Sequence, residues 1–86
     1  MPTISAFYGI IIRMHWADHG PPHFHAIYGG DEATIAIQTL ALLRGELPRR
    51  VLALTLEWAT LHQGELLENW DLCAKRQAPN RIAPLE

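Results

Sequence analysis

The sequence lacks the features that identify many enzyme classes. Its single cysteine, Cys73, excludes an intramolecular disulfide and a Cys-x-x-Cys motif. It has no glycine-rich nucleotide loop and no nucleophile elbow, so those kinds of nucleotide and hydrolase chemistry are not indicated. No segment approaches the roughly eighteen consecutive apolar residues of a membrane span, and no secretion signal is recognisable. We therefore expect a cytoplasmic protein with no membrane partner.

An excess of positive charge is also missing. Seven Lys and Arg residues against nine Asp and Glu residues give a formal net charge of −2, which provides no overall attraction for nucleic acid. A local basic patch would still suffice for a protein that acts on RNA. The 86 residues, of which 49% are hydrophobic, predict one globular domain over 1–86 with a thin stability margin.

Residues 1–45 form a β-rich half in which apolar side chains recur at every second position. In the second predicted strand, Phe24 points away from His23 and His25 and is expected to anchor the strand in the core. The segment Leu40 to Leu47 is compatible with a short fourth strand or with a packed loop. The three predicted strands are Gly9 to Trp16, His23 to Tyr28 and Ala33 to Gln38.

Residues 46–77 change to helical spacing. Pro48 suits the first turn of a helix, where its missing N–H costs nothing. We expect two helices that meet at Gln63-Gly64, followed by an extended tail over 78–86. The predicted fold is α+β, a small antiparallel sheet of three or four strands covered on one face by the two C-terminal helices.

Four of the five histidines fall within the eleven residues from His15 to His25. Residues two apart on a strand point the same way, so His23 and His25 are expected to share one face. Asp18 and His19 lie in the preceding loop, which Pro21-Pro22 stiffens. This cluster is the place where the sequence predicts a functional site.

Three interpretations of the cluster stay open. In acid–base chemistry, His23 and His25 would transfer protons to and from an RNA ribose and leaving oxygen, with Asp18 and His19 in support. In metal binding, His19, His23 and His25 would hold an ion such as zinc, although no cofactor is implied by a His-x-His pair. The third interpretation is a histidine-bearing surface with no chemical task.

Arginines are weaker candidates for phosphate or partner binding. Arg49 and Arg50 stand at the start of a predicted helix, where cations oppose the helix dipole, so a phosphate or partner would explain them. Arg13 lies on the first predicted strand and would neutralise a phosphate. Ordinary solvated charge explains the same residues.

Several motifs together resemble a known family, the domain of unknown function DUF4160. They are MPTISAFYGIIIRM, DHGPPHFHAIYGG, GELPRRVLALTLEWATLH and ELLENW, and the block PPHFHA is the most specific. The resemblance implies a small bacterial protein often encoded beside a second small protein, a pairing that suggests a toxin–antitoxin module. It implies no established activity or cofactor. His15 departs from the family pattern, which has an aromatic residue such as tyrosine there.

The leading hypothesis is therefore a component of a two-gene, toxin–antitoxin-like module that acts on RNA or through a small protein partner encoded nearby. A non-enzymatic protein-binding module and a metal-binding protein are the alternatives. Whether the protein is an enzyme is left open by the sequence.

Overall fold

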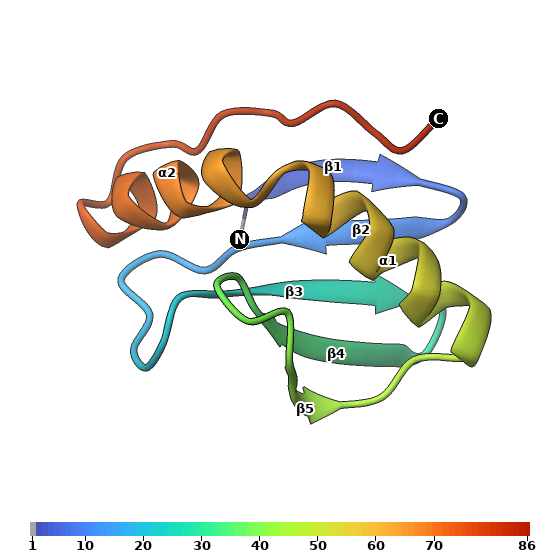
Figure 1. Ribbon diagram of the computed structural model, residues 1–86. Coiled ribbons are helices and arrows are strands. Elements are labelled where there is room, and N and C mark those ends of the chain that lie inside the picture. The colour runs from blue at the N-terminus through green and yellow to red at the C-terminus, as the bar shows by residue number, and fades with distance from the viewer. Residues whose placement is uncertain (1) are drawn as a thin grey trace.

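The computed structural model describes residues 2–86 as a five-stranded antiparallel sheet followed by two helices (Figure 1). The strands are neighbours in chain order, β1-β2-β3-β4-β5. The predicted α+β class is confirmed, with more strands than predicted. The elements are β1 (Thr3–Phe7), β2 (Ile10–Arg13), β3 (His23–Tyr28), β4 (Asp31–Ala36), β5 (Leu42–Gly45), α1 (Arg49–Leu61) and α2 (Gln63–Ala74).

Both helices lie on the same face of the sheet, which we call the covered face (Figure 1). Alternate residues of the central strands point into it, and Ile12, Phe24 and Ile35 are fully buried there. Trp58 of α1 is also fully buried, and its ring packs against Phe7 and Phe24. Because each fully buried large apolar side chain contributes about 1.5–3 kcal/mol, this layer supplies most of the stability.

The edge strands are the part of the sheet that the predictions did not define. β1 was not predicted, and its register shifts between Thr3 and Ser5, so that Ile4 and Ser5 are both buried and the period of two is lost. β5 occupies part of the ambiguous segment Leu40 to Leu47, and all four of its residues are exposed. The ladder that joins it to β4 is also irregular.

Gly45 fixes where β5 lies against β4. Its φ of +76° is in the left-handed region, and a Cβ built there would stand 2.1 Å from the Glu32 carbonyl oxygen. Only glycine permits this close approach of two backbones. Arg44 is thereby held opposite Thr34 on the neighbouring strand.

The helical half follows the predicted pattern closely. α1 begins directly after Pro48 and ends at Leu61, where His62 leaves the helical conformation. α2 then starts at Gln63, so Gly64 lies in its first turn and does not itself break the helix. Among residues 2–86, no helix is long and apolar enough to cross a membrane.

The segment 78–86 has no helix or strand but is bonded to three separate elements. The side chain of Asn69 in α2 both donates to and accepts from the backbone of Asn80. The Ile82 amide donates to the carbonyl of Ile4 in β1 at 2.8 Å. The Trp58 indole donates to the carbonyl of Ala83 at 2.8 Å. These bonds hold the tail beside α2 and along β1 (Figure 1).

Candidate functional site

A row of polar side chains crosses the sheet on the face opposite the helices, which we call the open face. Arg13 of β2 pairs with His25 of β3, His25 pairs with Thr34 of β4, and Thr34 pairs with Arg44 of β5. Directly paired residues project on the same side of a sheet, so the two arginines flank His25 and Thr34. The same alternation that buries Phe24 therefore gathers polar groups here.

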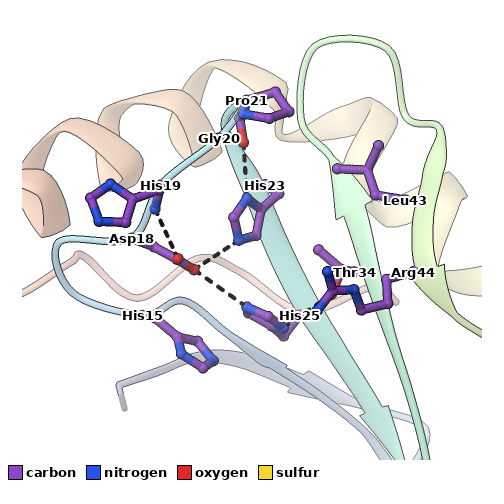
Figure 2. Close-up of a pocket in the computed structure, with 10 residues that line it drawn as sticks. All are labelled: His15, Asp18, His19, Gly20, Pro21, His23, His25, Thr34, Leu43 and Arg44. Atoms are coloured by element: carbon purple, nitrogen blue, oxygen red, sulfur yellow. Dashed lines mark hydrogen bonds and ion pairs between the residues drawn. The ribbon is translucent and has the colours of Figure 1, made fainter.

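The loop between β2 and β3 brings further side chains to this row. The Ala17 amide donates to the carbonyl of Cys73 at 3.0 Å, and the Pro22 carbonyl accepts from the Ile37 amide at 2.9 Å, so both sides of the loop are tied to the body. Ala17 has a φ of +52°, a conformation that costs a non-glycine residue free energy. The loop is thereby fixed with Asp18 directed toward the histidines (Figure 2).

The Asp18 carboxylate is the centre of the hydrogen bonding. Oδ1 accepts from the His19 amide at 2.8 Å, and Oδ2 bonds to His23 Nε2 at 2.9 Å. Partial burial on its own would raise the pKa of Asp18, but these two hydrogen bonds and the nearby histidines outweigh it, and the pKa lies below its ordinary value. The carboxylate form is therefore the one that the site favours.

His23 is buried and has an acceptor on each side of its ring. Nδ1 lies 2.9 Å from the Pro21 carbonyl oxygen, and Nε2 lies 2.9 Å from Asp18 Oδ2. Both ring nitrogens of His23 therefore face oxygen acceptors. The ring also packs against Trp70 of α2. His23 thus orients the Asp18 carboxylate through the contact between Nε2 and Oδ2.

His25 is bonded differently. Its Nδ1 lies 3.4 Å from the Thr34 hydroxyl and 3.3 Å from Glu32 Oε2, whereas Nε2 is buried without a hydrogen-bond partner among residues 2–86. Burial, together with the His15 and His23 rings, lowers the pKa of His25 despite the carboxylates of Glu32 and Asp18. A neutral ring with its proton on Nδ1 presents a free lone pair on Nε2.

Three donor groups converge at this point. One ligand atom each from His15, Asp18 and His25 can be chosen so that all three lie within 4.8 Å of one another. The His15 ring lies over the His25 ring with centroids 4.0 Å apart, and Asp18 Oδ2 is 3.9 Å from His25 Nε2. We call this group the triad. Two imidazoles and a carboxylate are a ligand set for Zn²⁺, Fe²⁺ or Ni²⁺.

A cavity of about 470 Å³ opens beside the triad (Figure 2). It is bounded by the loop on one side and by β4 and β5 on the other. Its volume is in the range of small-molecule sites. The residues that line it are His15, Asp18, His19, Gly20, Pro21, His23, His25, Thr34, Leu43 and Arg44.

The predicted site residues fall into two groups in the structure. Asp18, His23 and His25 interact directly, and His19 lines the cavity but bonds to Asp18 through its backbone. The predicted metal set of His19, His23 and His25 differs from the triad, which takes His15 and Asp18 with His25. His23 is not part of the triad, and both of its ring nitrogens face acceptors.

The predicted arginines are also separated. Arg13 stands beside His25 in the open-face row, and its Nε is buried without a partner among the described residues. Arg49 and Arg50 are exposed at the start of α1 and do not line the cavity. The sequence predictions did not place Thr34 or Arg44 at the site. The one signal that could have placed them there was the pairing of the predicted strand Ala33–Gln38 with a strand in the segment Leu40 to Leu47.

Fold and site together define a small α+β protein with a histidine–aspartate cluster on its open sheet face. A family model for a domain of unknown function, DUF4160, matches residues 9–71, a segment that includes the whole triad and cavity. The chain therefore belongs to the DUF4160 family, as its motifs predicted. Comparison with curated proteins and with solved structures gave no significant match.

Proposed function

We propose that this protein binds a divalent transition-metal ion through His15, Asp18 and His25. The observation that carries the proposal is that three ligand atoms lie within 4.8 Å of one another and that one of them, His25 Nε2, is buried with no partner among residues 2–86. An unpaired buried lone pair is costly, and a metal ion would satisfy it.

The groups around the triad support the same role. Glu32 and Thr34 face Nδ1 of His25, which directs its lone pair on Nε2 toward Asp18. Histidine ligands commonly have such a partner on the other ring nitrogen, because it fixes the tautomer and the ring orientation. His23 does the corresponding work for Asp18 by holding Oδ2 at 2.9 Å.

The number of protein ligands indicates what kind of metal site this is. Structural zinc sites are closed by four protein ligands, whereas catalytic sites use three and keep a position for water or substrate. The triad offers three, and the cavity lies beside it. We therefore propose a site that activates or binds a small molecule.

The test is a Co²⁺ titration of tag-free protein, followed by visible absorption. We expect one ion per chain, and we expect His25→Ala, Asp18→Asn and His15→Phe each to weaken binding by more than about a hundredfold, since ligand loss exceeds the 10–100-fold effect of a supporting residue. His15→Phe keeps an aromatic ring against His25 and removes only the donor nitrogen.

His19→Ala and His62→Ala are the matched controls, because they remove a histidine inside and outside the loop cluster. Both should bind Co²⁺ as the wild type does. If His19→Ala lost the ion and His15→Phe retained it, the set of His19, His23 and His25 would replace the triad. An absence of absorption change in folded wild-type protein would refute metal binding.

A second candidate is metal-free acid–base cleavage of RNA, and the Asp18–His23 ion pair at 2.9 Å favours it. In this scheme His25 would accept the proton of a ribose hydroxyl and His23 would supply one to the leaving oxygen. Cleavage of RNA in the presence of a chelator, lost in both His23→Gln and His25→Ala, would support it over the metal proposal. The small protein partner and the toxin–antitoxin setting stay predictions.

A further inference from the structure

The Arg44 guanidinium is a cation at the cavity with no acid to neutralise it. Arg44 lines the cavity from β5, and no carboxylate of the described residues lies within 4.0 Å of any arginine. Figure 2 shows its side chain extended beside Thr34 and His25, on the opposite side of the cavity from the loop. Gly45 and the ladder opposite Thr34 hold the residue in that position.

With neutral histidines, Arg13 and Arg44 balance the carboxylates of Asp18 and Glu32 in formal charge around the cavity. Asp18 is paired with the His23 ring, and Glu32 faces the His25 ring, so the two carboxylates are already engaged. Arg44 has no such partner, and Arg13 adds a second unpaired guanidinium in the same row. A divalent ion on the triad would make the net charge here positive, and a positively charged cleft concentrates anions.

We propose that the cavity binds an oxyanion, a phosphate or a carboxylate, between the Arg44 guanidinium and the metal ion on the triad. This inference rests on the proposed function, because the triad without a metal presents Asp18 to the anion. The planar guanidinium matches both oxyanions, which it binds with paired hydrogen bonds.

The cavity also indicates the size of the ligand. About 470 Å³ is more than a lone phosphate or carboxylate fills, and Leu43 and Pro21 give the cavity apolar walls. The expected ligand is a small organic anion whose charged group meets Arg44 and whose apolar body lies against Leu43. Phenyl phosphate and benzoate are suitable probes, with inorganic phosphate as the probe without a body.

The experiment is isothermal titration of each probe into Zn²⁺-loaded protein, in the wild type, Arg44→Gln and Arg50→Gln. Arg50 is the matched control because it carries the same charge, is exposed, and does not line the cavity. We expect Arg44→Gln to weaken binding about tenfold or more, since a hydrogen bond to a charged group is lost, and Arg50→Gln to change it less than twofold.

Each result decides between the two proposals. Stronger binding of phenyl phosphate than of benzoate would assign the phosphate class, and the reverse would assign the carboxylate class. Equal loss in the two arginine variants, or no heat from any probe although Co²⁺ binds normally, would overturn the oxyanion site and leave the metal site standing. Failure of Co²⁺ to bind in the separate absorption titration would overturn the metal site independently of the anion measurements.

Discussion

The two faces of the sheet are built from the same strands but differ in what their side chains have as partners. On the covered face, Phe24 and Ile35 are enclosed by other apolar groups. On the open face, His25 and Arg13 each keep a buried nitrogen without a partner in the described part of the chain. Adjacent residues of β3, Phe24 and His25, thus belong to two different environments.

This difference separates stability from function. Apolar packing on the covered face is satisfied by the chain itself, so the groups there need nothing more. The polar groups of the open face are partly satisfied, and native proteins rarely leave buried donors and acceptors unpaired without a role. The covered face therefore accounts for the fold, and the open face is where a ligand is expected.

The largest predicted effect is the difference in unfolding free energy between substitutions on the two faces of β3. Phe24→Ala should destabilise the protein by about 3–5 kcal/mol, because it leaves a cavity beneath α1. His25→Ala should change stability by less than about 1 kcal/mol, as substitutions outside the core do. Urea unfolding followed by circular dichroism measures both.

Because a domain this small has a thin stability margin, Ile35→Val provides a milder version of the Phe24→Ala test. It should cost about 0.5–1.5 kcal/mol. A larger loss from His25→Ala than from Ile35→Val would show that the open face carries stability, and the comparison of the two faces would fail.

The next effect concerns the strand that supplies Arg44. Gly45→Ala should destabilise by at least about 2 kcal/mol, because it combines a positive φ with a Cβ against the Glu32 carbonyl. Gly64→Ala is the control, since nothing lies within 4 Å of its Cβ position in α2. It should stabilise by up to about 1 kcal/mol, the helix propensity difference. Thermal unfolding of the pair gives opposite shifts, and a matching sign in both would contradict this explanation.

Glu32→Gln should affect the open face alone. Its carboxylate lies 3.3 Å from His25 Nδ1, so the substitution weakens the group that orients this ligand. We expect Co²⁺ affinity to fall about tenfold, the lower end for a supporting residue, with unfolding free energy unchanged. The control is Glu57→Gln on α1, and a similar loss in both variants would indicate a general charge effect.

The smallest effect is expected at Cys73, a buried residue of α2. Burial raises the pKa of its thiol, so the folded protein keeps a proton that the unfolded chain releases as the pH rises above about 8.5. Because the folded state then binds more protons, stability falls with rising pH in this range. The unfolding free energy of Cys73→Ala, measured from pH 7 to 10, should show a shallower decline than that of the wild type. Equal slopes of unfolding free energy against pH in the two proteins would contradict this effect of the Cys73 thiol.

The regular, two-sided part of the fold could be predicted from the sequence. β3 matches the predicted strand His23 to Tyr28 at both ends, because Phe24 and Ala26 alternate with His23 and His25 and because prolines and glycines bound the segment. α1 was predicted from Pro48 and a wide apolar stripe. These elements have a local pattern that matches their tertiary environment.

The edge strands and part of the site depend on information that the local sequence does not contain. β1 has a register shift that places Ile4 and Ser5 together in the interior, and β5 has exposed Leu42 and Leu43, so neither alternates. At the site, Asp18 and the histidines were predicted as a group, but the choice of His15 over His19 depends on the direction of the loop. Arg44 was missed because it reaches the cavity only through strand pairing.

The tail described above has a practical consequence for handling the protein. Asn80, Ile82 and Ala83 supply backbone groups to α2, β1 and α1, so residues at the far end of the chain finish the hydrogen bonding of its first strand. Removing residues 79–86 would expose the β1 edge, and bare strand edges promote intermolecular pairing. Shortened versions should therefore form aggregates before they lose helix content, and purification tags are better joined beyond Glu86 than substituted for this segment.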